Sequence, residues 1–210
     1  MKIQLFTIFV LTLVLLSAGC NRTSRDELIE EGSRKVQEKN YRGAVVLYKS
    51  VLEKDQHDLR ARFLLADAYL RAGRFDLAEK ELAQVADQDP EYSGLALARA
   101  ELYLQARKPI EALRELERER QGGTSDAQWL VLRGRALLME GNLRQAEEAL
   151  REAARLAPGE SGIRLLLAEC LVRGGQEPVA REILQQLLRE NDRDPEPYRR
   201  LAQLATARRR

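Results

Sequence analysis

The feature that most constrains this chain is a repeat of 34 residues that runs through it without insertion or deletion. Five alanines stand 34 residues apart; the residue twelve positions before each is small, and the residue four positions after it is large and apolar. The alanines are Ala44, Ala78, Ala112, Ala146 and Ala180; the small residues are Gly32, Ala66, Ala100, Gly134 and Ala168, continuing to Ala202; the large residues are Tyr48, Leu82, Leu116, Leu150 and Leu184. Such a period indicates stacked structural units that bury their apolar faces against one another.

Each unit is predicted to be two helices joined by a turn. In residues 59–92, apolar side chains recur with helical spacing up to Tyr69, Gly73 interrupts the pattern, and a second stripe begins at Leu77. Prolines fall only at turns and helix starts. This agrees with the prediction, since a proline inside a helix would destabilise it by about 3 kcal/mol. The turn glycines are Gly73, Gly141 and Gly175, and the prolines that open helices are Pro109, Pro178, Pro195 and Pro197.

Shorter sequence patterns predict where some helices begin, how the helices pack and how the array ends. Ser24 with Glu27, and Ser125 with Gln128, have the spacing of a capping box at a helix start. The alternation of small and large residues predicts tightly paired helices, because antiparallel helices approach closely only where one presents Gly or Ala. The last helix is expected to close the array with one apolar stripe, made of Tyr198, Leu201, Ala202 and Ala205.

Charge and cysteine content exclude some classes of function. The 35 basic and 33 acidic residues leave a net charge of only +2, so no whole-protein field would attract nucleic acid. Charged residues make up 32% of the chain and aromatic residues 5%, which is typical of amphipathic helices. Cys170, flanked by apolar residues, is expected to be a buried thiol rather than a redox or metal site.

The first nineteen residues are predicted to be a signal peptide. Lys2 precedes an uncharged, mostly apolar run over residues 3–16, and small residues then lead to Cys20. The run is too short to span a bilayer comfortably, since a transmembrane helix takes about 20 apolar residues. Export is therefore favoured over a permanent membrane span.

The segment Leu16-Ser17-Ala18-Gly19-Cys20 resembles the bacterial lipobox, in which the cysteine is lipidated and begins the mature protein. This resemblance implies that Cys20 carries the membrane anchor. Asn21 follows the cysteine rather than Asp, which in Gram-negative lipoproteins implies the outer membrane, facing the periplasm. The expected organisation is a signal peptide (1–19), a lipidated tether (20–24), five repeats (25–58, 59–92, 93–126, 127–160 and 161–194), and a capping helix with a basic tail (195–210).

With this period and these positions, the chain resembles the tetratricopeptide repeat (TPR) family from about Arg25 to Ala205. Residues 59–92 and 127–160 match best; the former has Leu65, Ala66, Tyr69, Gly73, Ala78, Leu82 and Pro90 at the family's signature positions. The resemblance implies an all-α fold: a right-handed superhelical TPR solenoid of about five helix-turn-helix repeats plus a C-terminal capping helix.

The family resemblance also implies a concave groove lined by the first helix of each repeat. The residues carried onto groove positions are Ile29, Phe63, Asp67, Arg71, Leu97, Glu101, Val131, Arg135, Leu165, Glu169 and Arg173. A mostly apolar floor edged by mixed charges suits a peptide segment of a partner protein. In the alternative interpretation, the apolar residues pack between helices, and Asp67 with Arg71 and Glu169 with Arg173 are ordinary i,i+4 pairs. The basic clamp with which some TPR domains grip a C-terminal carboxylate is absent.

An enzyme is not expected, and neither are catalytic residues, a metal ion or a cofactor. His57 is the only histidine and lies at a junction between repeats, where a solvated loop histidine is the simpler interpretation. Glycines occur at turns, and no phosphate-binding loop follows a strand.

We therefore expect a lipid-anchored TPR scaffold that binds protein partners in an envelope or secretion machine, with its oligomeric state left open. The chain is similar to lipoproteins of exopolysaccharide and exosortase-associated secretion in the runs Ala44-Val45-Val46, 61–65 and 78–82, and to type IV pilus pilotins in size and anchoring. Lipoproteins of β-barrel assembly or envelope maintenance are a third group. A polysaccharide-binding accessory protein is the alternative class, and it would call for an aromatic-lined groove.

Overall fold

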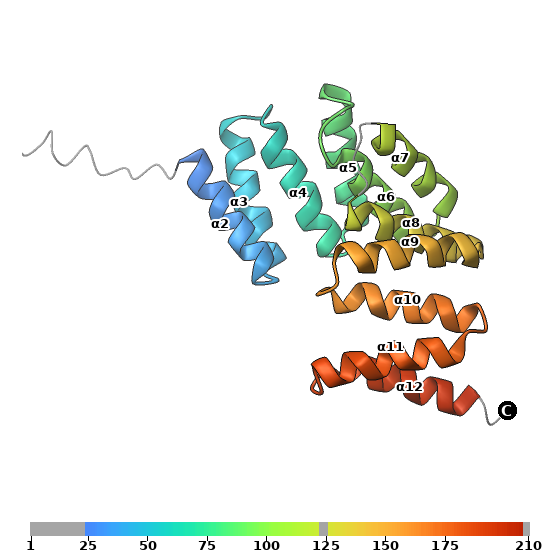
Figure 1. Ribbon diagram of the computed structural model, residues 1–210. Helices are drawn as coiled ribbons and strands as arrows, with labels where there is room; N and C mark the ends of the chain where they lie inside the picture. The colour runs from blue at the N-terminus through green and yellow to red at the C-terminus, as the bar shows by residue number, and fades with distance from the viewer. Residues whose placement is uncertain (1–23, 122–125, 208–210) are drawn as a thin grey trace, which may run out of the picture. The chain divides into compact units, whose positions relative to one another are not determined.

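The computed structural model describes residues 24–121 and 126–207, and within these ranges the chain is entirely helical (Figure 1). The described helices are α2 (Arg25–Gln37), α3 (Tyr41–Lys54), α4 (Leu59–Arg71), α5 (Phe75–Gln88), α6 (Leu95–Gln105), α7 (Pro109–Gln121), α8 (Ala127–Glu140), α9 (Leu143–Leu156), α10 (Ser161–Arg173), α11 (Glu177–Glu190) and α12 (Pro195–Ala207). The all-α prediction is confirmed. The expected signal peptide, Cys20 and the basic tail after Ala207 lie outside the described residues.

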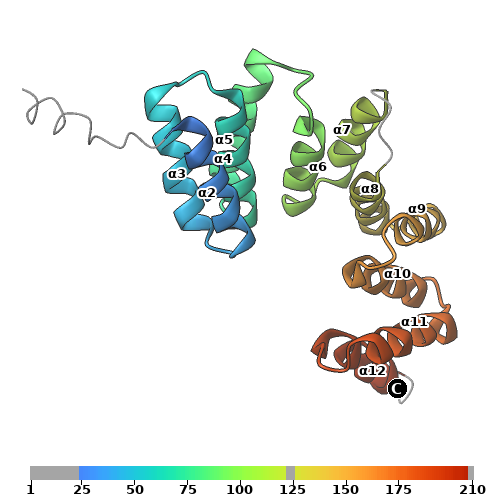
Figure 2. The same ribbon diagram turned by 60° about the vertical axis from the view of Figure 1, so that its left-hand side comes forward.

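The chain divides into two compact units, residues 1–72 and 73–210. The described part of the first unit contains α2, α3 and α4, and the second contains α5 to α12. The division falls at the Gly73 turn, within the second 34-residue repeat and not between repeats. In the second unit, helices that follow one another in the chain pack in sequence, as Figures 1 and 2 show for α8 to α12. We call the first helix of each repeat its A helix and the second its B helix.

The starts of α2 and α8 follow from short-range signals in the sequence. Ser24 caps α2 through a complete capping box with Glu27, as predicted. The second predicted capping box is wrong, because α8 begins one residue later: the Asp126 side chain accepts the backbone N–H of Trp129 at 2.8 Å. An aspartate at this position serves as well as a serine and its charge also favours the positive end of the helix.

One turn position, repeated every 34 residues, has a left-handed backbone in all five repeats. Gly73, Gly141 and Gly175 have φ of +70°, +80° and +77°, as the predicted turns require. At the same position in the first and third repeats, Lys39 and Arg107 adopt φ of +58° and +56°. A side chain is strained in this conformation, so the packing of the two flanking helices imposes the turn even where glycine is missing.

The small and large positions predicted from the repeat are buried in every repeat. The five reference alanines are all fully buried, and so are the large residues four positions later. A Cβ placed on Gly134 would lie 2.6 Å from Cγ of Leu150, and one on Gly32 would overlap the ring of Tyr48. In the first and fourth repeats the A and B helices therefore touch backbone to side chain at this point, at a separation that leaves no room for a Cβ.

The stripe predicted to bury α12 is wrong. Tyr198 is 51% exposed, and Ala202 and Ala205 are also exposed. Pro197 and Leu204 are buried instead, with Leu201 half-buried beside them. Proline and leucine remove more apolar area from water than two alanines do, so the helix is rotated toward them.

The close approach at Gly134 reverses the usual effect of replacing a helical glycine by alanine. We expect Gly134→Ala to lower the free energy of unfolding by about 1 to 3 kcal/mol, because the new methyl group overpacks the contact with Leu150. Gly162→Ala in α10, where a Cβ would meet nothing within 4 Å, should raise it by up to about 1 kcal/mol. Urea denaturation followed by circular dichroism measures both. A Gly134→Ala variant as stable as the parent would contradict the packing.

Candidate functional site: the A-helix face

The predicted groove residues of the first unit lie in two different environments. Ile29 is only 2% exposed and packs with Leu28, Val51 and Ala61, so it offers almost no surface to a partner. Phe63 and Asp67 on α4 are half-buried, and Arg71 is exposed. Nε of Arg71 donates to Oδ2 of Asp67 at 2.7 Å, which is the i,i+4 pair that the alternative interpretation predicts.

The predicted groove residues of the second unit lie on three A helices that contact one another in order, α6 with α8 and α8 with α10. We call this surface the A-helix face. All its residues are half-buried except Arg173, which is exposed. They are Leu97 and Glu101 on α6, Val131 and Arg135 on α8, and Leu165, Glu169 and Arg173 on α10. Whether they bind a partner stays a prediction.

An ion pair joins two of these helices across a full repeat. Nη1 of Arg135 donates to Oε1 of Glu101 at 3.3 Å, and the two side chains are 32% and 36% exposed. The same register position thus carries opposite charges in neighbouring repeats. At this exposure the pair contributes less than about 1 kcal/mol to stability, so it orients the two side chains more than it holds the helices together.

The ion pair that Glu169 makes differs from the predicted one. Glu169 accepts a hydrogen bond from Nη1 of Arg200 on α12 at 3.1 Å, and not from Arg173 one turn away. Arg200 in turn donates from Nε to Glu196 at 3.1 Å. Among the described residues Arg173 has no ion-pair partner. The prediction failed because α12 was treated only as a cap, although α12 supplies the next helix of the same face.

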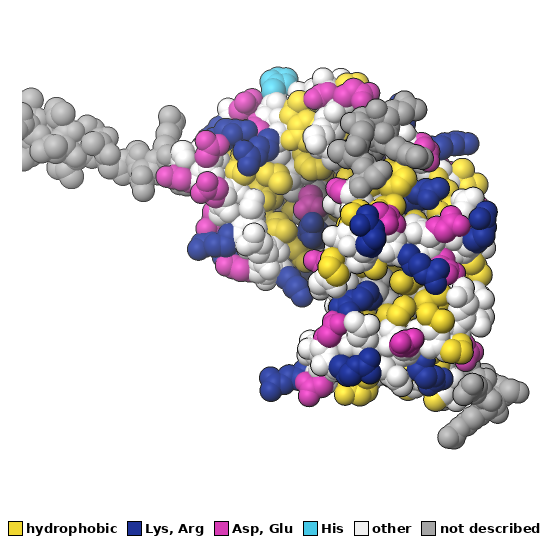
Figure 3. Space-filling view, viewed as in Figure 1, with side chains coloured by type: hydrophobic (Ala, Val, Ile, Leu, Met, Phe, Trp, Pro, Cys, Tyr) yellow, Lys and Arg dark blue, Asp and Glu magenta, His cyan; other side chains and the backbone are white. Residues whose placement is uncertain are grey.

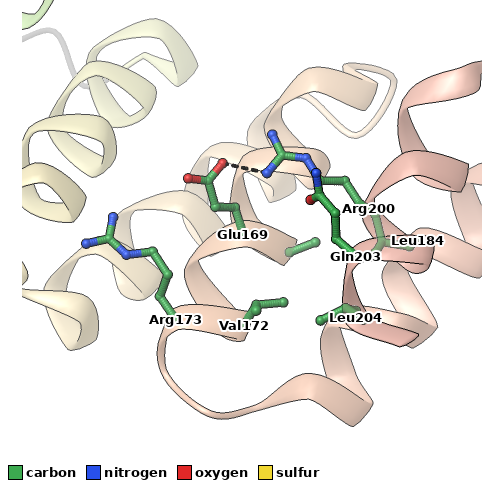
Figure 4. Close-up of a pocket in the computed structure, with 8 residues that line it drawn as sticks. Glu169, Val172, Arg173, Leu184, Arg200, Gln203 and Leu204 are labelled. Atoms are coloured by element: carbon green, nitrogen blue, oxygen red, sulfur yellow. Dashed lines mark hydrogen bonds and ion pairs between the residues drawn. The ribbon is translucent and has the colours of Figure 1, made fainter. Parts of the chain in front are cut away.

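A hollow of about 250 Å3 opens where this face reaches α12 (Figure 4). Its apolar lining is Ala168, Val172, Leu184 and Leu204, and its polar lining is Glu169, Arg173, Arg200 and Gln203. Sequence reasoning named Glu169 and Arg173 but missed the residues of α12. A signal was present, since Gln203 stands 34 residues after Glu169 and so occupies the register position of a groove residue.

Residues that could have served other chemistry have structural roles. Cys170 is 1% exposed, and burial raises the pKa of its thiol, so it stays protonated at neutral pH. This agrees with the predicted buried thiol. His57 is exposed in the loop before α4, and Trp129 is 4% exposed, with its Nε1 donating to the carbonyl of Leu116 at 2.8 Å.

Two negative observations apply to residues 24–121 and 126–207. Within them, no group of three or more His, Cys, Asp or Glu side chains is placed so that it could hold a metal ion. None of the helices in these ranges is both long and apolar enough to cross a membrane.

Comparison with known sequences identifies the repeat. A family profile described as tetratricopeptide repeat matches residues 35–91 and 137–204, and a second profile of the same description matches residues 97–161. The chain belongs to the tetratricopeptide repeat family. TPR proteins are scaffolds for protein–protein interaction and are typically not catalytic. The comparison with curated proteins found no match.

Solved structures of TPR proteins share the fold at low sequence identity. The TPR protein TTC0263 from Thermus thermophilus aligns with a TM-score of 0.75 and 21% identity, over 86% of this chain and 98% of that one. A TPR protein from Parabacteroides merdae aligns with a TM-score of 0.72 and 16% identity, over 94% and 78%. Pseudomonas aeruginosa PilF aligns with a TM-score of 0.69 and 20% identity, over 88% and 85%. These similarities show the fold.

The A-helix face should tolerate substitution far better than the core of the TPR repeats. We expect Arg135→Ala to lower the free energy of unfolding by less than about 1 kcal/mol, because its ion pair is half-exposed. Leu150→Ala, at a fully buried position, should lower it by about 2 to 5 kcal/mol. Urea unfolding followed by the fluorescence of Trp129, the only tryptophan, measures both. Equal losses in the two variants would mean that the face is structural.

Proposed function

We propose that the chain is a membrane-anchored TPR scaffold of the bacterial envelope that binds a protein partner through the A-helix face. The observation that carries the proposal is the chemistry of that face in the second unit. Leu97, Val131 and Leu165 are half-buried apolar residues in register, and partly exposed charges of both signs border them. Neighbouring partly exposed apolar side chains edged by charge are the usual chemistry of a peptide-binding surface.

The charge pattern favours a specific protein over a general polyelectrolyte. On the side of the molecule drawn in Figure 3, hydrophobic side chains are interleaved with basic and acidic ones over α9 to α12. A surface without a large field of one sign does not select nucleic acid by electrostatics. Alternating charges instead fix the register of a partner that carries the complementary pattern.

A polysaccharide is the less favoured ligand because the aromatic side chains needed to stack on sugar rings are not on this surface. The indole of Trp129 is 4% exposed, Tyr69 is 6% exposed, and Tyr103 packs half-buried against the core of the second unit. In the described residues these rings therefore support packing between helices.

The membrane anchor and the location are proposed from residues 1–24. In this proposal, the segment that precedes Cys20 is cleaved, lipids on Cys20 insert in the outer membrane, and the repeats face the periplasm. Several acyl chains on one residue hold a protein firmly, since each buried CH₂ contributes about 0.8 kcal/mol. The partner then belongs to an envelope machine: exopolysaccharide secretion or a type IV pilus-like system, with β-barrel assembly or envelope maintenance as the third group.

The neighbouring genes distinguish these machines. Genes for secretins and pilins beside this one would support the pilus-like role, and genes for glycosyltransferases and exosortases would support polysaccharide secretion. The similarity to PilF supports the fold only, because 20% identity does not carry a function.

Lipidation is tested by labelling cells with radioactive palmitate. We expect the parent protein and a Cys170→Ala variant to incorporate the label and to fractionate with membranes. Cys20→Ala should lose both properties, because Cys170, the one other cysteine, is buried within the repeats. Label in the Cys20→Ala protein, or none in the parent, would contradict the anchor.

The scaffold role is tested by crosslinking in envelopes, affinity purification and mass spectrometry. A double variant, Glu101→Arg with Arg135→Glu, keeps the ion pair but exchanges its charges, and we expect it to recover several-fold less of the identified partner. The matched control exchanges the exposed pair of Arg144 and Glu148 on the B helix α9, and it should recover as much as the parent. The scaffold role would be contradicted if neither the lipidated protein nor Cys20→Ala recovered an envelope partner. It would also be contradicted if the two charge exchanges reduced the recovery of the partner equally.

A further inference from the structure

The hollow between α10 and α12 has the size of a pocket for one side chain. Its volume of about 250 Å3 lies below the roughly 300–1,000 Å3 of pockets that enclose whole small ligands. Four apolar side chains line it, and three of them come from different helices: Val172 from α10, Leu184 from α11 and Leu204 from α12. The pocket therefore suits an apolar side chain whose backbone stays outside.

The base of the pocket is made of buried, packed side chains. Leu184 is 1% exposed and Leu204 is 4% exposed, and both belong to the same buried cluster as Ala168. A pocket built on packed side chains is already formed before a partner arrives, so binding costs little ordering of the protein.

The polar rim has one more cation than carboxylate. Glu169 and Arg200 pair with each other at 3.1 Å, and Figure 4 shows that pair on one side of the hollow. Arg173 stands on another side, its guanidinium extends away from the pair, and it makes no ion pair with any described residue. An exposed, unpaired cation beside an apolar pocket is complementary to a carboxylate beside an apolar side chain.

We propose that this hollow is an anchor pocket for an acidic–apolar peptide segment of the partner: a Leu, Ile, Met or Phe side chain enters the hollow, and a neighbouring Asp or Glu pairs with Arg173. The proposal rests on the proposed scaffold function and adds the chemistry of the recognised segment. Because the Arg173 guanidinium extends away from α12, the segment runs from the hollow along the A-helix face toward α8.

The test selects twelve-residue peptides from a random display library on the purified full-length chain. The enriched peptides are synthesised and their affinities measured by fluorescence anisotropy. We expect enrichment of an aliphatic residue or Phe next to Asp or Glu. Val172→Phe, which fills the hollow, and Arg173→Glu should each weaken the best peptide at least about tenfold.

Two controls separate recognition from folding. Arg189→Glu reverses an exposed arginine in the last turn of α11, as Arg173→Glu does at the end of α10, and it should bind within about twofold of the parent. A peptide with its acidic residue changed to Lys should lose binding to the parent and regain it with Arg173→Glu, a rescue that a misfolded variant cannot give.

Several results would overturn the anchor pocket: no enrichment, enrichment of cationic or purely apolar peptides, selection of segments from this chain itself, or peptides that bind Val172→Phe and Arg173→Glu as well as the parent. Failure here is distinguishable from failure of the scaffold function. If the envelope partner is still recovered and neither variant reduces its recovery, the scaffold stands and the pocket does not.

Discussion

The structure depends on one contact, found in the first, third, fourth and fifth repeats: the point where a Gly or Ala of the A helix meets the large residue four positions after the reference alanine of the B helix. The contact at Gly134 leaves no room for a methyl group against Leu150. Because the helices can pair this closely at only one point, the contact fixes which residues of each A helix face inward. Residues beside the contact on the same A helix, such as Arg135 next to Gly134, therefore lie at its edge and are half-exposed.

Much of the fold could be predicted from the sequence because the repeat supplies the same information five times. The helices, the turn glycines and the cap at Ser24 each rest on local chemistry, and all are found. The failures occur where tertiary packing decides between local options. Asp126 is preferred to Ser125 as a cap, and Lys39 and Arg107 accept a left-handed turn that a sequence pattern assigns only to glycine.

The candidate site could be predicted in part, for a related reason. Register alone places Glu101 and Arg135 on neighbouring helices, but it does not say which charges pair. Arg200 takes Glu169 because α12 continues the stack and brings its guanidinium closer than Arg173, and this follows from the rotation of α12 that buries Leu204. The unpaired Arg173 and the hollow beside it are consequences of that rotation, which no local motif specifies.

The central claim is that the A helices, and not the B helices, contact the partner. Photocrosslinking in intact cells tests it most directly, with a photoreactive amino acid placed at Met139 on α8, which is 40% exposed, or at the exposed Arg144 on α9. We expect a crosslinked adduct with an envelope protein from position 139 and none from position 144. Adducts from position 144 alone, or equally from both, would contradict the claim.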